Sequence, residues 1–411
     1  MKRKGCIIMR KKILTMGLIA TMILGSIVPV QGADKTYITG KEYVKMLEKV
    51  TGKKLDTSNV TLGSKVSYAD ACVLAERADV LQNGSRDSDS LKKIKENVKK
   101  YKRISDLNKI PKVKQGEVIS CFSKGIFTGK SNGTYSQSDS ISTKLYINKS
   151  QAQTIRNRIK DTKQRRKITE DGQVIRTTNL PKNAKKFPYV LESIPNSFYD
   201  SYFNWEGRIK LLDKNIERRY PKDVTKGTMI LWDEKVPVKE KIDKYRYEWA
   251  EKVKKNVSTR LNFNYKTVTN KWINDLQSTY FVYGDSYDKY MTNDIKDYIS
   301  KAKKNHVIIK CDKVVVEPSS LYYNEVHGGY TYRCYAKFKI TADNKAFTRS
   351  AQNNNELIYS GYPIAQWLKK AESGKTINLV FDVSVGTRAM NDDGSTYAVN
   401  DWDQIIDNMR K

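Results

Sequence analysis

The sequence predicts a multidomain α+β protein with an all-α N-terminal part, a connector rich in proline and tyrosine, and a C-terminal α+β roll. Apolar residues recur at helical spacing through residues 36–160. From residue 170 onward, prolines punctuate a stretch rich in tyrosine and charge. Residues 330–341 then alternate between apolar and charged side chains, as half-buried strands do. Helices followed by antiparallel strands are typical of an α+β arrangement.

The N-terminus has the layout of a secretory signal peptide, which we place at residues 1–32. Six basic residues precede an apolar stretch over residues 13–30, and Val30-Gln31-Gly32 offers small or slim residues for cleavage after Gly32. The apolar stretch is also close to the length of a membrane-spanning helix, so an uncleaved anchor is the alternative. Cleavage predicts a secreted protein with no stable membrane span.

The charge of the chain predicts a polyanionic partner. The 411 residues carry a formal net charge of +31, and about +25 remains when the predicted signal peptide is removed. Such a field attracts polyanions. Nucleic acid is the usual partner of a basic chain, but the export signal argues against it and no nucleic-acid motif is present. For an exported protein, the expected polyanions are cell-wall polymers or anionic lipid headgroups.

Three short segments share the pattern of a helix start. In each, an aliphatic residue precedes a capping residue, and an acid or amide follows three positions later. The segments are Ile38-Thr39-Gly-Lys-Glu42, Val66-Ser67-Tyr-Ala-Asp70 and Ile147-Asn148-Lys-Ser-Gln151. The capping side chain can accept a hydrogen bond from the third backbone N–H, and the acid or amide can return one. Each segment therefore predicts the N-terminus of an amphipathic helix, although three ordinary helix starts would look the same.

A glycine-rich loop precedes the third of these helix starts. It connects that predicted helix to another predicted helix before it. The loop reads Lys-Gly-Ile-Phe-Thr-Gly-Lys-Ser-Asn-Gly-Thr-Tyr over residues 124–135, and Ile104-Ser-Asp106 stands before the first helix. This order resembles the S-layer homology (SLH) module of Gram-positive, clostridial-type cell-surface proteins. The resemblance implies one complete helical module at 104–160 and a degenerate one at 36–83, separated by a basic helix and linker at 84–103.

The resemblance also implies a ligand and a site. The family binds anionic cell-wall polysaccharide in grooves between three modules, through an arginine near each helix start and through loop residues. The arginine positions correspond here to Gly40, Tyr68 and Lys149, and the loop aromatic to Lys130. Lys130, Asn132 and Lys149 are therefore the predicted ligand-binding residues. Because the family groups three modules, a homo-oligomer could complete a site.

The second half of the chain is predicted as a connector over 168–243, with short helices such as 197–205, and a roll over 244–411. The order of the roll resembles the cystatin-like or nuclear-transport-factor-like roll, which implies no chemistry by itself. Its expected helices are 245–261, 268–282, 287–305 and a closing helix at 401–409. Its expected strands are 307–317, 330–341 and 376–387.

Four cysteines follow the predicted signal peptide, which is too few for a disulfide scaffold. Cys72 and Cys121 lie on apolar helix faces and are expected to be buried thiols. With a turn centred near residues 322–323, Cys311 and Cys334 are expected almost opposite each other on neighbouring antiparallel strands. Both a disulfide and two free thiols fit that position.

The sequence does not predict an enzyme, a metal site or a cofactor. Gly129-Lys-Ser131-Asn-Gly133 matches the nucleophile-elbow pattern, but that chemistry needs a strand-to-helix turn and a nearby histidine. The only histidines are His306, expected at a strand start, and His327, expected in a loop. Two other functions stay open: an exported wall-modifying enzyme with its site in the C-terminal part, and a structural or adhesive protein.

Overall fold

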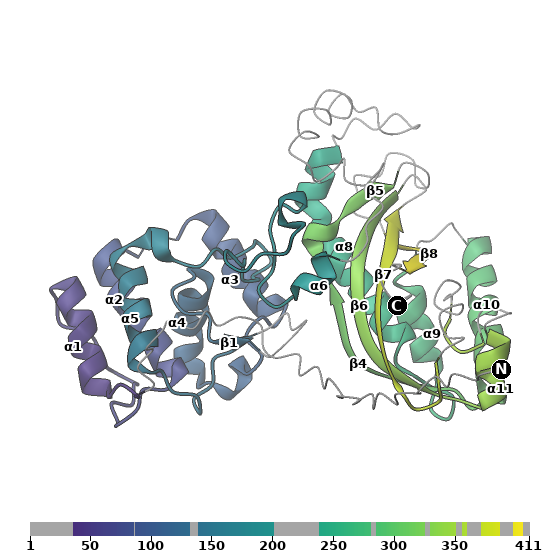
Figure 1. Cartoon of the computed structure of the whole chain (residues 1–411), viewed down its shortest axis with the longest axis horizontal. Coiled ribbons are helices and arrows are strands. Elements are labelled where there is room, and N and C mark those ends of the chain that lie inside the picture. The colour runs from purple at the N-terminus through teal and green to yellow at the C-terminus, as the bar shows by residue number, and fades with distance from the viewer. Residues whose placement is uncertain are drawn as a thin grey trace, which may run out of the picture.

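The computed structural model places a helical part beside an antiparallel sheet part, and a connecting segment lies between them (Figure 1). The helical part is residues 36–167, the connecting segment is 168–200, and the sheet part is 238–405. The predicted α+β class is therefore confirmed. The structure describes residues 36–85, 87–131, 139–200, 238–280, 285–324, 329–350, 356–359, 371–386 and 398–405. Among these residues, no helix combines the length and the apolar character needed to cross a membrane. The predicted signal peptide lies outside the described residues.

The helical part begins its helices where the capping pattern predicts them. Thr39 and Glu42 form a reciprocal capping box at the start of α1, and Asn148 and Gln151 form another at the start of α5. At α2, Ser67 accepts the hydrogen bond of the Asp70 backbone N–H, but the Asp70 carboxylate accepts from the Ser67 hydroxyl instead of the backbone. Among the described residues of this part, the α-helices are α1 (Gly40–Thr51), α2 (Tyr68–Asn83), α3 (Asp89–Lys100), α4 (Lys112–Ser123) and α5 (Lys149–Lys160).

One hydrophobic core holds these helices together. The buried face of α1, almost every apolar residue of α2, and the inner faces of α4 and α5 belong to a single cluster. Helix α2 lies at its centre and packs against α1, α4 and α5. Residues 36–83 and 104–160, which the sequence suggests as two modules, therefore share a core.

The described part of the glycine-rich loop, residues 124–131, is held in place by motif residues that flank the loop. Gly125 ends α4 in the left-handed conformation, with φ of +67°, and a Cβ there would lie 2.0 Å from the Arg166 carbonyl oxygen. The hairpin of β1 (Lys130–Ser131) and β2 (Asp139–Ser140) follows. The Asp106 carboxylate accepts hydrogen bonds from the Ser140 hydroxyl at 2.6 Å and the Ile141 backbone N–H at 2.9 Å. The motif around Asp106 is thus structural in this chain.

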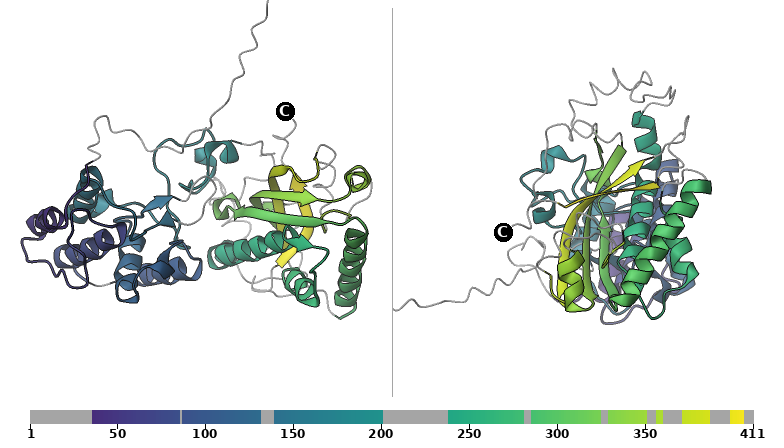
Figure 2. Two further views of the ribbon diagram at one scale, coloured as in Figure 1. Left: turned by 90° about the horizontal axis from the view of Figure 1, so that it is seen from below. Right: turned by 90° about the vertical axis from the view of Figure 1, so that its right-hand side faces the viewer.

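The sheet part is an antiparallel sheet whose main order is β3-β4-β6-β7-β8, with β5 also paired to β6. Its helices α8, α9 and α10 lie on one side of the curved sheet (Figure 2), and aromatic side chains such as Trp249 and Tyr298 fill the space between. The helices are α8 (Val238–Arg260), α9 (Asn270–Gln277), α10 (Asp285–Lys304) and α11 (Asn344–Ser350). The strands are β3 (Phe263–Asn264), β4 (Ile308–Val316), β5 (Tyr322–Asn324), β6 (Gly329–Thr341), β7 (Thr376–Gly386) and β8 (Ala398–Ile405).

The connecting segment covers part of the opposite face of the sheet. Its short helix α6 (Asn196–Tyr199) and neighbouring apolar residues pack on Val315 of β4 and Tyr335 of β6. The charged residues that alternate with the inward-facing residues of β6 lie on this outer face. Arg333 is buried and pairs with Asp382 at 3.2 Å.

Two expectations about the C-terminal part are wrong. The sequence predicts a C-terminal helix at 401–409, but residues 401–405 belong to strand β8 and pair with β7. Residues 406–409 lie outside the described residues. Cys311 and Cys334 do lie on neighbouring strands, but Cys311 is opposite Phe338 and Cys334 is opposite Val316. The hairpin turns later than expected, because a 3₁₀ turn at Pro318–Ser320 and strand β5 extend the chain before it reverses.

Cys311 and Cys334 are therefore expected to stay unlinked. Four residues separate their pairing positions along β6, which is about 13 Å at the rise of a strand and well beyond the ~7 Å limit for a disulfide. Cys72, Cys121, Cys311 and Cys334 are all free thiols in the structure. Alkylation of unfolded residues 33–411 should add four groups with or without prior reduction. Fewer groups without the reductant would contradict this register.

Candidate functional site

The three helix starts that share the capping pattern meet at one end of the helical part. Tyr37 pairs with Asn148, and Ser67 pairs with Tyr146, as antiparallel bridges. The Lys149 backbone N–H donates to the Thr36 carbonyl at 3.0 Å. The segment before α5 therefore lies between those before α1 and α2. Because an α-helix carries partial positive charge at its N-terminus, this end of the helical part favours anions.

The residue just before each aliphatic position of the pattern contributes to one exposed cluster. Tyr37 precedes Ile38, Lys65 precedes Val66, and Tyr146 precedes Ile147. The Tyr37 and Tyr146 rings meet edge to face, with centroids 6.0 Å apart. The Lys65 ammonium lies 4.3 Å from the Tyr37 centroid and 5.8 Å from that of Tyr146. We call these three residues the tyrosine–lysine patch.

The patch is accessible and its chemistry is specific. Tyr37 is 43% exposed and Tyr146 is 40% exposed, and the carbon of both rings would gain from cover by an apolar surface. Tyrosine offers a flat ring and a polar hydroxyl, which suits the C–H face and the hydroxyl groups of a sugar. An ammonium group between two rings adds an attraction for a carboxylate or phosphate. The patch can therefore hold an acidic sugar.

Lys149 is next to this patch, at the first position of α5. Its side chain is exposed, and the first turn of α5 contains no acidic residue. A cation at a helix N-terminus is electrostatically unfavourable, so its position there favours an anionic ligand. Hydrogen bonds from the Thr39 backbone and hydroxyl lower the pKa of Glu42, and the Lys149 charge lowers it further.

The other predicted site residues have different positions. Lys130 is exposed on β1 opposite Ser140, and no contact in the described part of the chain joins it to Lys149. Asn132 lies outside the described residues. Gly40, at an arginine position of the family, is packed so that a Cβ would lie 2.5 Å from the Leu62 Cα. Tyr68 is buried, and its hydroxyl accepts from the Gln151 amide at 3.0 Å. Of the three arginine positions, only Lys149 presents a charge to solvent.

Several other basic residues of the helical part form ion pairs with acidic residues of the same part. Lys114 pairs with Asp70 at 2.6 Å, and Lys124 pairs with Asp79 at 3.0 Å. Arg165 also pairs with Asp79. These cations neutralise acids on α2 and hold α4 and the end of the α5 region against it. They are therefore less available to a ligand than Lys65 and Lys149.

The sequence prediction named Lys149 and did not include the tyrosine–lysine patch. The sequence does contain a signal for the patch, because all three patch residues occupy the same position relative to the capping pattern. Their separation along the chain, from 37 to 146, hides their contact until the three helix starts are placed together.

Comparison with protein-family models, with curated proteins and with solved structures finds no match to this chain. Within the described ranges, no group of three or more histidine, cysteine, aspartate or glutamate side chains is placed to hold a metal ion. His306 lies in the turn between α10 and β4, where its ring is 3.2 Å from the Asp343 carboxylate. His327 lies outside the described residues.

Proposed function

We propose that this protein is an exported cell-surface protein that binds anionic cell-wall polysaccharide non-covalently through the tyrosine–lysine patch and Lys149. The observation that carries the proposal is the exposed pair of tyrosine rings with the Lys65 ammonium over them. Stacking of sugar rings on Tyr37 and Tyr146 would supply shape recognition. Lys65 and Lys149 would supply attraction to the acidic groups of the polymer.

Two further observations support this function. The high positive charge of the chain favours a polyanion, and the N-terminal sequence is typical of export. The motifs around Asp106 and Gly125 resemble the SLH module of wall-bound proteins. We further propose that 36–83 and 104–160 are SLH-like modules, that copies of the chain could associate to complete a groove, and that 244–411 is a cystatin-like roll displayed at the cell surface.

Binding to purified cell walls tests the proposal directly. The mature protein should sediment with walls, and much less with walls stripped of their polysaccharide. Tyr37→Ala/Tyr146→Ala should weaken binding about tenfold, from the loss of about 0.5–1.5 kcal/mol per aromatic contact. Lys65→Ala and Lys149→Ala should each cost a few-fold at low salt. Retention should fall as salt rises, because ~0.1 M salt screens exposed charges over about 10 Å.

Matched controls separate a specific site from a basic surface. Tyr290→Ala removes a tyrosine of α10 that is 68% exposed, and Lys99→Ala removes an exposed charge of α3. Both should bind walls like the unmodified protein, and circular dichroism should show that all variants keep their fold. If Lys99→Ala weakens binding as much as Lys65→Ala, the helical part is only a basic surface. If the full chain is not retained at low salt, a structural or adhesive role replaces wall binding.

A further inference from the structure

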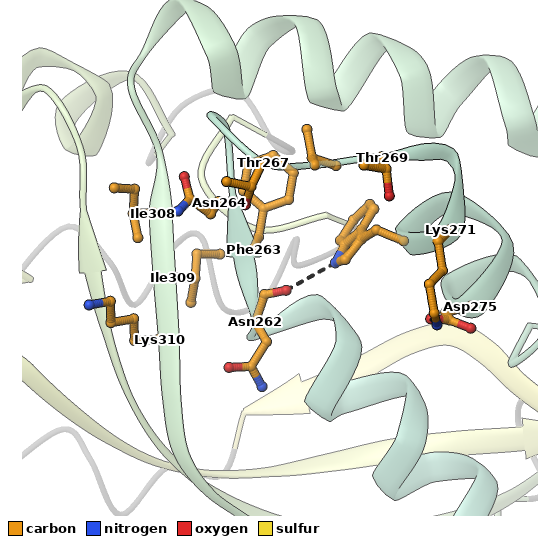
Figure 3. Close-up of a pocket in the computed structure, with 12 residues that line it drawn as sticks. Asn262, Phe263, Asn264, Thr267, Thr269, Lys271, Asp275, Ile308, Ile309 and Lys310 are labelled. Atoms are coloured by element: carbon orange, nitrogen blue, oxygen red, sulfur yellow. Dashed lines mark hydrogen bonds and ion pairs between the residues drawn. The ribbon is translucent and has the colours of Figure 1, made fainter.

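A concave site lies in the sheet part, far along the chain from the tyrosine–lysine patch. It is a pocket of about 410 Å³ between β3, the loop before α9, the first turns of α9 and the start of β4. Figure 3 shows Phe263, Asn264, Thr269, Lys271 and Lys310 around it. Its volume falls in the ~300–1,000 Å³ range of small-molecule sites.

The aromatic wall of this pocket is held rigidly by the protein itself. The Trp272 indole N–H donates to the carbonyl oxygens of Thr259 and Asn262, both at 3.0 Å. The Asn262 side chain accepts from the Cys311 backbone N–H at 3.2 Å and donates to the Ser258 carbonyl at 2.8 Å. The Trp272 ring also meets Phe263 edge to face at 5.2 Å. A fixed ring with its polar atom already satisfied is a preformed surface for stacking.

Polar groups around this wall still have hydrogen-bonding capacity. Thr269 is the N-cap residue of α9, yet its side chain makes no capping hydrogen bond. The Asn264 side-chain oxygen accepts from the Lys266 backbone N–H at 3.0 Å, and its amide hydrogens have no partner among the described residues. Lys310 is exposed at the start of β4, on the rim of the pocket. A hydroxyl, an amide and an ammonium therefore border one aromatic wall.

We propose that this pocket binds a short glycan segment with an acidic sugar. The apolar face of a sugar ring would lie on Trp272, as aromatic side chains favour. Thr269 and Asn264 would bond its hydroxyl or acetamido groups, and Lys310 would attract its carboxylate. The inference concerns residues of the sheet part alone and does not rest on the function proposed for the helical part.

Fluorine NMR of the full mature chain labelled with 5-fluorotryptophan tests this site. The probe is the disaccharide of N-acetylglucosamine and N-acetylmuramic acid, which has two sugar rings and one carboxylate. Chitobiose is the matched probe without the carboxylate. We expect both sugars to shift the Trp272 resonance, which Trp272→Phe identifies by its loss. Should that variant fold poorly, Thr269→Val identifies the same resonance by displacing it.

Lys310→Ala should weaken binding of the acidic disaccharide about two- to fivefold, as an exposed ion pair does, and leave chitobiose unchanged. Lys303→Ala, an exposed lysine of α10 outside the pocket, should change neither. Tyr37→Ala/Tyr146→Ala should keep the Trp272 shift, so failure of this site and of the first are distinguishable. A Trp272 resonance that does not move at millimolar sugar, or an equal effect of Lys310→Ala on both sugars, would overturn the proposal.

Discussion

Arg103→Ala is expected to destabilise the protein by about 3–5 kcal/mol, the cost of breaking a buried ion pair from one side. The Arg103 side chain is 3% exposed and that of Asp171 is 1% exposed. Two hydrogen bonds join them, from Nη2 to the Asp171 carboxylate at 2.5 Å and from Nε to the Asp171 carbonyl at 2.9 Å. Removing the guanidinium leaves the Asp171 charge buried without its cation. Urea unfolding followed by circular dichroism measures the loss.

The contact matters because it fastens the connecting segment to the helical part. Gly172, next to Asp171, has φ of +83°, and a Cβ there would lie 2.7 Å from a Val98 methyl carbon of α3. Arg103 also reaches toward Glu251 of α8, at 3.8 Å. A single side chain thus touches the connecting segment and the sheet part. Its loss should loosen both junctions.

A neighbouring ion pair provides the control. Lys93 of α3 pairs with Glu170, but its side chain is 58% exposed. Exposed pairs contribute about 0–1 kcal/mol, so Lys93→Ala should lower stability by no more than that. The double variant Arg103→Met/Asp171→Leu should lose less than the sum of the single alanine variants, since it leaves no unpaired charge. Equal costs for Arg103→Ala and Lys93→Ala would contradict the assignment of Arg103 as a buried anchor.

Local chemistry made the helical part predictable. The capping boxes at Thr39 and Asn148 depend on residues three positions apart, so the sequence contains them completely. The alternation of β6 was equally visible, because its inner residues pack on the helices as the period-2 pattern requires. The residues buried on its outer side were not predictable in this way. Tyr335 is buried there by the connecting segment, whose docking depends on residues far away in the chain.

The errors in the sheet part have the same origin. The segment 401–405 has the polar composition of an exposed helix, and only its pairing with β7 makes it a strand. The register of Cys311 and Cys334 depended on where the hairpin turns, and a bulge between Cys311 and Lys313 shifts it further. The tyrosine–lysine patch likewise needs three segments to assemble. Local sequence patterns therefore do not predict the contacts between distant segments.

Glu317→Gln is expected to remove a loss of stability that the unmodified protein shows as pH rises from about 4.5 to 7. Burial raises the pKa of Glu317 to about 7, although hydrogen bonds from the Tyr199 hydroxyl and the Ser319 backbone N–H oppose the rise. The folded state thus holds this proton more tightly than the unfolded state, whose glutamate titrates near pH 4.5. The contribution of Glu317 to the free energy of unfolding is greatest below that unfolded pKa. It falls by about 3 kcal/mol in total as the pH rises to the folded pKa. Thermal unfolding between pH 4 and 8 measures this slope.

The position of Glu317 decides what the slope reports. Its carboxylate accepts from the Tyr199 hydroxyl of the connecting segment, and Tyr199 accepts from the Leu191 backbone N–H at 2.8 Å. Ionisation above pH 7 therefore puts a charge where the connecting segment packs on the sheet. Glu192→Gln is the matched control, because Glu192 lies in the same segment but is half-buried and paired with Arg166 at 2.6 Å. That variant should keep the slope of the unmodified protein, whereas Glu317→Gln should flatten it. An unchanged slope in Glu317→Gln would mean that another group causes the pH dependence. The pKa of Glu317 would then be the same in the folded and unfolded states.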